Sequence, residues 1–169
     1  VNDNMGNGHS IYYFNNDGDF RLIRKGGDFA VGGFYSQMCE YLGFYPSLTD
    51  AGKVMALAAY NKDKVNDHLH NIVWPDVVRM GDIYHGDQYQ HLMAHHGIKD
   101  FPSSRFFFPQ LKGEGGKADP KWLDKKDWDS ELSKQIAADT QYILENSVSN
   151  MLHRLFEYNR ISKNICFSG

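Results

Sequence analysis

The sequence predicts an α/β chain that starts with antiparallel strands, continues through helices and returns to a strand. Two segments rich in strand-forming residues, Ser10–Phe14 and Phe20–Arg24, predict the antiparallel strands. The turn-forming residues Asn15–Asp19 lie between them. A long apolar stripe with helical spacing runs over about 127–158. The apolar run that begins at Ile165 predicts the return strand Asn164–Phe167.

The first helix after the strands is predicted over 29–42, where the apolar residues recur with helical spacing. Gly43 should end it, since glycine readily adopts the left-handed conformation found just after helices. Thr49 and Asp50 are good N-cap residues, so they predict that the next helix covers 51–60.

Further helices are predicted over about 64–74 and 87–96, the second of them ended by Gly97. Either Asp127 or Asp129 is expected to cap the long helix, because Asp is a preferred N-cap residue.

Composition predicts a folded globular chain. With 169 residues, 14% aromatic and 23% charged, the chain can bury one sizeable core. A net charge of −3 argues against nucleic acid as a partner. Apolar runs stay well below the about 20 residues that span a bilayer, so no membrane partner is expected. Cys39 and Cys166 have no metal or redox spacing, which favours free thiols in a reducing cytoplasm.

A polar, glycine-bearing turn covers residues 3–8. Backbone N–H groups exposed around Asn4, Gly6 and Gly8 can bind phosphate oxygens. Asp3, at the end of an expected strand, offers a carboxylate to a metal ion. The alternative is an ordinary hairpin turn, which the residues alone favour.

Lys53 is the second candidate. It stands near the start of its predicted helix, where the helix dipole disfavours a cation. A bound anion would offset that effect. The alternative is a solvated lysine on an amphipathic helix.

Two polar pairs occur at i, i+4 spacing. His91 and His95 could chelate a metal ion, but no Glu follows His91 and no third ligand is evident. We expect an exposed helix face there. Gln141 and Glu145 are likewise expected to form an exposed polar pair beside the apolar stripe of the long helix.

Three segments together resemble the N-terminal domain of the nodulation-type O-carbamoyltransferases. These are Gly32-Gly33-Phe34-Tyr35-Ser36, Tyr41-Leu42-Gly43-Phe44 and Gly52-Lys53-Val54-Met55-Ala56-Leu57-Ala58-Ala59-Tyr60. The chain departs from the family pattern at three positions, where the family has Gly, Pro and Gly. These positions hold Ala56, Ala59 and Asn61.

The resemblance implies part of an actin-like domain, of the kind shared by actin, Hsp70 and sugar kinases. It implies ATP-dependent transfer of a carbamoyl group from carbamoyl phosphate, through a carbamoyl-adenylate, to a hydroxyl of a small-molecule acceptor. ATP and a divalent metal ion, iron or magnesium, are the implied cofactors. The whole of 1–169 is expected to be a single internal fragment of that domain, with a helical and loop insertion at about 62–126 and flanking segments missing.

The resemblance also assigns roles to single residues. Lys53 would be catalytic and Asp3 would bind metal. The nucleotide or its phosphates would be bound by Asn4, Gly6, Gly8, Ser168 and Gly169. The family's histidine pair for metal would lie before Val1, so His91 and His95 should not be taken for it.

Two alternatives stay open from the sequence. Another phosphotransferase of the same fold, such as a sugar kinase, would explain the glycine turn but not the Tyr-Leu-Gly-Phe and Gly-Lys-Val-Met segments. A non-catalytic binding or scaffold module would explain the departures around Lys53 and the Asn at position 4.

Overall fold

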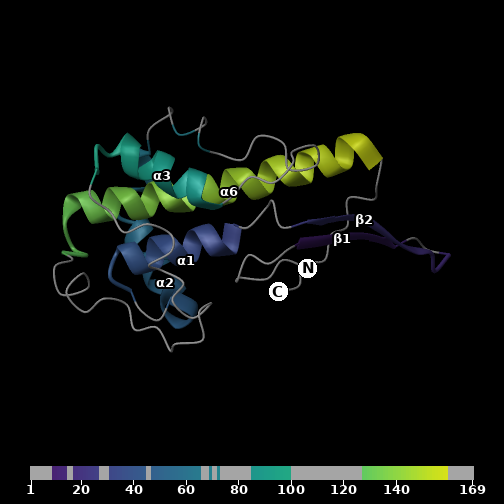
Figure 1. Cartoon of the computed structure of the whole chain (residues 1–169), viewed down its shortest axis with the longest axis horizontal. Coiled ribbons are helices and arrows are strands. Elements are labelled where there is room, and N and C mark those ends of the chain that lie inside the picture. Colours follow the sequence, from purple (N-terminus) through teal and green to yellow (C-terminus); the bar gives the residue numbers. More distant parts are fainter. Residues whose placement is uncertain are drawn as a thin grey trace.

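A computed structural model describes residues 9–14, 17–26, 31–44, 47–65, 69, 72, 85–99 and 127–159. The elements are β1 (His9–Phe14), β2 (Phe20–Gly26), α1 (Val31–Tyr41), α2 (Ser47–Ala58), the 3-10 helix η1 (Lys62–Lys64), α3 (His85–His95) and α6 (Glu131–Asn159). In Figure 1, α1 and α3 lie beside α6, α2 lies next to α1, and the hairpin extends away at one end.

The two strands form the antiparallel hairpin that alternating strand formers predict. Tyr12 pairs with Leu22 and Phe14 with Phe20, with a bulge between Ile11 and Tyr12. The rings of Tyr12 and Phe20 stack with centroids 4.7 Å apart. Ile11 packs against the helical core, so the hairpin is attached there. The predicted strands are therefore confirmed, each with slightly wider bounds.

The first helix ends as predicted. Gly43 has a positive φ of 87°, and its N–H donates to the carbonyl of Glu40 at 3.0 Å. The N–H of Phe44 donates to the carbonyl of Cys39 at 2.9 Å. This pair of bonds is a Schellman cap, which satisfies carbonyls that the helix leaves without partners.

The second helix starts earlier than predicted. Its first residue is Ser47, so Thr49 and Asp50 lie inside the helix and do not cap it. Asp50 sits in the first turn, where the positive end of the helix dipole favours a carboxylate. An acidic residue suits both a cap and a first turn, and this is why the sequence pattern misplaced the boundary.

The helix predicted over 64–74 does not begin at Lys64. Lys64 ends η1, and Val65 is extended with φ −63° and ψ 133°. Farther on, the N–H of Ile72 donates to the carbonyl of Leu69 at 2.8 Å, and both side chains are buried. The remainder of that prediction lies outside the described residues.

The helix predicted over 87–96 is confirmed as α3. It ends in a second Schellman cap, in which the N–H of Ile98 donates to the carbonyl of Met93 at 2.9 Å. Gly97 has the positive φ of 68° that this cap requires.

The long helix is confirmed as α6, but its cap differs from the prediction. Ser130 Oγ accepts the N–H of Ser133 at 3.1 Å, and Ser133 Oγ donates to the carbonyl of Asp127 at 2.7 Å. Ser130 is therefore the N-cap, and the prediction of Asp127 or Asp129 is wrong. Three residues that can cap a helix stand close together here, and the backbone places the last of them at the helix start.

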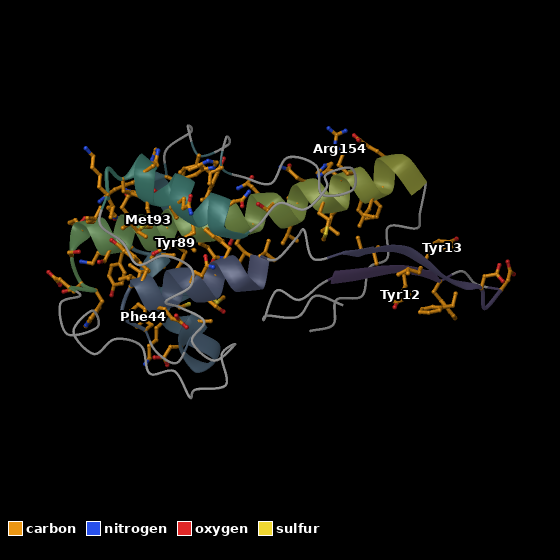
Figure 2. The ribbon with its side chains drawn as sticks, in the orientation of Figure 1. Tyr12, Tyr13, Phe44, Tyr89, Met93 and Arg154 are labelled. Atoms are coloured by element: carbon orange, nitrogen blue, oxygen red, sulfur yellow. The ribbon has the colours of Figure 1, made fainter. Side chains whose placement is uncertain are left out.

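The core lies where α1 meets α2, α3 and α6. Tyr89 and Met93 of α3 lie between the helices, whereas Tyr12 lies out on the hairpin (Figure 2). The predicted buried thiol is confirmed for Cys39, while Cys166 lies outside the described residues. The largest fully buried side chains are Tyr89, Phe34, Met38, Leu42, Leu69, Leu92, Met93, Ile136, Ile143 and Gln37.

The described residues agree with the predicted order of antiparallel strands followed by helices. The predicted turn at 3–8 and the return strand Asn164–Phe167 lie outside them, as does the part of the predicted insertion over 100–126. Among the described helices, none is both long and apolar enough to cross a membrane.

Candidate functional site

Of the predicted site residues, the structure describes Lys53. The others lie outside the described residues: Asp3, Asn4, Gly6, Gly8, Ser168 and Gly169. The site is therefore built here from Lys53 outward.

Lys53 sits in the second turn of α2 with 60% of its side chain exposed. Its Nζ lies 2.8 Å from Oδ2 of Asp50, one turn earlier. The dipole effect fades within the first turn, and Asp50 supplies a negative charge. The chain itself therefore provides a carboxylate that can offset the dipole at Lys53. An exposed pair of this kind contributes only about 0.5 kcal/mol, so another anion can displace Asp50.

Lys53 borders an open hollow of about 460 Å³. Its described lining includes three aromatic side chains, of which Tyr60 is 72% and Trp128 54% exposed. Apolar surface of this kind favours a flat or apolar group, and the lysine adds a positive charge at its side. The lining residues are Phe44, Lys53, Ala56, Leu57, Tyr60 and Trp128. Sequence reasoning missed Trp128, which reaches α2 only through the tertiary fold.

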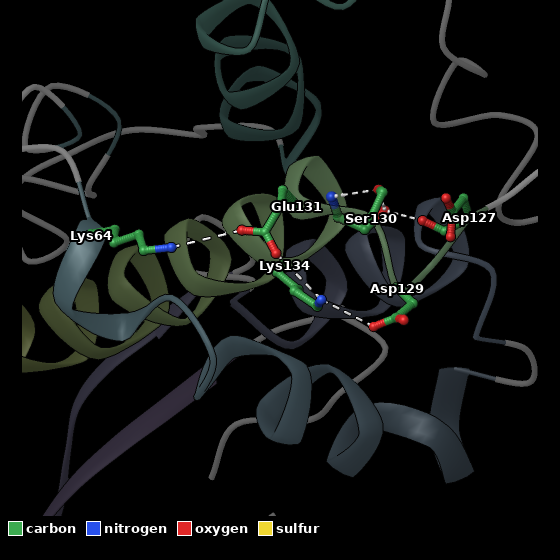
Figure 3. Close-up of polar contacts among 7 residues, drawn as sticks. Lys64, Asp127, Asp129, Ser130, Glu131 and Lys134 are labelled. Carbon is green, nitrogen blue, oxygen red and sulfur yellow. Dashed lines mark hydrogen bonds and ion pairs between the residues drawn. The ribbon is translucent and has the colours of Figure 1, made fainter.

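A charged cluster lies beside this hollow at the start of α6 (Figure 3). Lys134 Nζ is 3.1 Å from Asp129 and 3.4 Å from Glu131, and it lies 5.5 Å from the centre of the Tyr60 ring. Glu131 in turn is 3.7 Å from Lys64 Nζ. The cluster thus connects η1 with the start of α6 and places Lys134 over one wall of the hollow.

The same contacts set the ionisation of the cluster. The hydrogen bond from Lys134 is the main reason that the pKa of Glu131 is lowered. The hydrogen bond with Asp129 is the main reason that the pKa of Lys134 is raised. Glu131 and Lys134 are therefore both charged near neutral pH.

The polar pair on α6 is less exposed than predicted. The hydroxyl of Tyr35 donates to Gln141 Oε1 at 3.0 Å, and Gln141 Nε2 donates to Glu145 Oε1 at 2.6 Å. Gln141 is half-buried and Glu145 exposed. Burial, followed by the neighbouring Cys39 and Glu145, raises the pKa of Tyr35, so its hydroxyl stays a donor. This pair connects α1 to α6, and the expectation of a purely exposed pair is wrong.

The three segments that resemble the family supply much of the core. Phe34 is 0%, Leu42 1% and Val54 0% exposed. Five members of these segments line the hollow, and Lys53 is the charged one among them; the others are Phe44, Ala56, Leu57 and Tyr60. The motif thus forms the packing of α1 on α2 and also presents one lysine to a surface hollow.

His91 and His95 are both exposed on α3, as an exposed helix face requires. Among the described residues, three side chains bring potential metal-ligand atoms close together, and only one of the two histidines is among them. The three are His95, His96 and Asp139. Sequence reasoning did not find it. The available signal was a carboxylate, Asp139, placed within the apolar stripe of α6 between Ile136 and Ile143.

Together these features define a helical domain with an antiparallel hairpin and a lysine-bearing aromatic hollow. The sequence model of the family described as Carbamoyltransferase N-terminus matches residues 3–169. The chain belongs to this family of carbamoyltransferase N-terminal domains, which confirms the resemblance seen in the sequence. Neither the search of curated proteins nor that of solved structures gives a match. The family's chemistry is carbamoyl transfer in general.

Proposed function

We propose that this chain is part of an ATP-dependent O-carbamoyltransferase. The enzyme moves the carbamoyl group of carbamoyl phosphate, through a carbamoyl-adenylate, to a hydroxyl of a small acceptor. The observation that carries the proposal is the family match over residues 3–169. Because that family is named for an N-terminus, the proposed enzyme includes further chain, and its assays use the complete protein. The buried free thiol of Cys39 suits a reducing cytoplasm.

The phosphate and metal roles enter this proposal from the sequence. Asp3 would hold a divalent ion, iron or magnesium, and its carboxylate is the oxygen donor that hard cations prefer. The bound ion would neutralise phosphate charge. The backbone N–H groups of the turn at 3–8 would bind phosphate oxygens, and Ser168 and Gly169 would contact the nucleotide.

Lys53 would act by electrostatics. Its exposed pair with Asp50 leaves the ammonium able to turn to a stronger anion. The aromatic hollow beside it offers a surface on which a flat group could lie. Lys53 would thereby stabilise negative charge on the transferring or leaving group, a role whose loss lowers turnover by about a hundredfold or more.

The test measures the fate of ATP in the complete protein. Hydrolysis of carbamoyl phosphate would give carbamate and inorganic phosphate, and attack of the carbamate oxygen on the α-phosphorus of ATP would displace pyrophosphate. We therefore expect pyrophosphate release that depends on carbamoyl phosphate, with one inorganic phosphate formed for each pyrophosphate. Lys53→Gln should lower this rate, whereas Lys62→Gln, at an exposed lysine of η1, should not. Equal rates in both variants would remove Lys53 from the proposed site.

The same assay separates the alternatives. A phosphotransferase of the same fold would convert ATP to ADP without pyrophosphate. A non-catalytic module would leave ATP unchanged with every donor and acceptor. Either result would contradict the proposed function.

A further inference from the structure

Two histidines at the end of α3 meet a carboxylate of α6. His95 is the last residue of α3 and His96 follows it, while Asp139 lies in the third turn of α6. Each offers one ligand atom, and these atoms all lie within 4.8 Å of one another. The helices α3 and α6 pack against each other here (Figure 1).

The inner part of this cluster is buried. The side chain of Asp139 is 1% and that of His96 is 9% exposed, and Asp139 Oδ2 lies 2.8 Å from His96 Nε2. Even so, neither atom has a hydrogen-bond partner among the described residues, since closeness without alignment does not make a hydrogen bond. Buried polar atoms are nearly always satisfied. A cation bound to both atoms, beside the line that joins them, would satisfy both, because each would direct a lone pair at the ion.

The carboxylate is held in place from its other side. Gln135 Nε2 donates to Asp139 Oδ1 at 2.8 Å, and the same nitrogen lies 3.3 Å from the carbonyl of Lys64. This contact leaves Oδ2 facing His96. Metal-ligating carboxylates are commonly oriented by such an outer hydrogen bond.

The histidine side of the cluster also suits a cation. The rings of His95 and His96 meet at 86° with centroids 5.1 Å apart, so they do not stack. His95 is exposed, which gives an ion access from solvent. The C-terminal end of a helix carries partial negative charge, and this end of α3 therefore favours a positive ion.

We propose that His95, His96 and Asp139 bind a divalent transition-metal ion. Two imidazoles and one carboxylate are the donor set of Zn²⁺ and of similar ions such as Co²⁺ and Fe²⁺. The three residues leave a further coordination position for water. The ion connects α3 to α6, so its first effect is to stabilise that contact. The site is separate from Asp3 and does not rest on the proposed function.

The test uses the complete protein without an affinity tag, stripped of metal by a chelator and titrated with Co²⁺. Beyond any ion held through Asp3, we expect one equivalent to bind at this cluster with the visible absorption of Co²⁺ held by nitrogen and oxygen ligands. His95→Ala and Asp139→Asn should each weaken the binding of this equivalent by about a hundredfold or more, since even outer-shell changes cost 10–100-fold. Zn²⁺ should raise the melting temperature of the wild type and not of these variants.

His91→Ala is the matched control, because His91 is an exposed histidine one turn before His95. It should keep the Co²⁺ spectrum and the Zn²⁺ response. An equal loss in His91→Ala and His95→Ala would show chelation by the exposed helix face and overturn the proposal. So would unchanged affinity in Asp139→Asn or no saturable equivalent in the wild type. Circular dichroism checks that Asp139→Asn is folded, and if it is not, the comparison of the two exposed histidines decides.

Discussion

Ser130→Ala removes the side-chain cap of the longest helix, whose hydroxyl also donates to Ser133 Oγ at 3.0 Å. Ser130 Oγ accepts the N–H of Ser133 at 3.1 Å, and Ser133 is 8% exposed. Water is therefore poorly placed to replace the lost acceptor. Removing an N-cap serine lowers the free energy of unfolding by about 1 kcal/mol. In a domain of this size, that corresponds to a melting temperature lower by about 2–4 °C.

Matched variants show whether capping is the cause. Ser130→Asn keeps a side-chain acceptor and should melt close to the wild type, and Ser130→Gly should lose only a few tenths of a kcal/mol, roughly. Ser149→Ala, at an exposed position within α6, should not destabilise, since alanine favours helices. Thermal unfolding followed by circular dichroism gives the comparison. A Ser130→Ala protein that melts with the wild type, or a Gly variant that melts as low as the Ala variant, would refute the assignment of Ser130 as the cap.

Two further predictions concern the candidate site and the core. Asp3→Asn should lower carbamoyl transfer by the complete protein by about a hundredfold or more and change its stability by less than about 1 kcal/mol; intact turnover with a clearly lower melting temperature would make Asp3 a structural residue. Stability should also fall in alkaline solution. Burial is the main cause that raises the pKa of the Cys39 thiol from 9.0 to about 12. The contribution of the neutral thiol to the free energy of unfolding is therefore complete below pH 9 and is lost as the pH rises toward 12. At about pH 10 the loss is on the order of 1 kcal/mol, measured as a lower urea midpoint. Cys39→Ala should show a shallower fall with pH, and identical slopes would contradict this cause.

Local signals in the sequence predicted the ends of two helices correctly. Gly43 and Gly97 both adopt positive φ, and each closes its helix through bonds to residues only a few positions earlier. Such caps depend on the local chain alone. The starts of α2 and α6 were harder to place, because several capping residue types stand side by side and serve equally well in a first turn. There the competing positions are separated by small free-energy differences.

Contacts between distant segments were not predictable in the same way. Trp128 reaches the hollow beside Lys53, and His96 meets Asp139, only because α6 packs across α2 and against α3. No periodicity within one segment encodes such a meeting. The sequence did carry one unused sign, since a carboxylate at Asp139 within an apolar stripe needs a partner when it is buried.

The family-like segments were informative in a different sense. They identified the family correctly, yet the structure shows that most of their residues, Phe34 and Val54 among them, form the core. Motif residues therefore preserve the fold as well as the chemistry. Lys53 is the member of these segments that combines charge with exposure beside a hollow.

The most direct test of carbamoyl transfer follows the donor carbon. The complete protein is mixed with ¹³C-carbamoyl phosphate and ATP without an acceptor, quenched, and analysed by mass spectrometry. The proposed function predicts a species that carries the ¹³C-carbamoyl group on AMP, with pyrophosphate formed in equal amount and no such species when ATP is omitted. The proposed function would be contradicted if the label stayed in carbamoyl phosphate while ATP was converted to ADP. It would also be contradicted if the label stayed in carbamoyl phosphate and ATP remained intact.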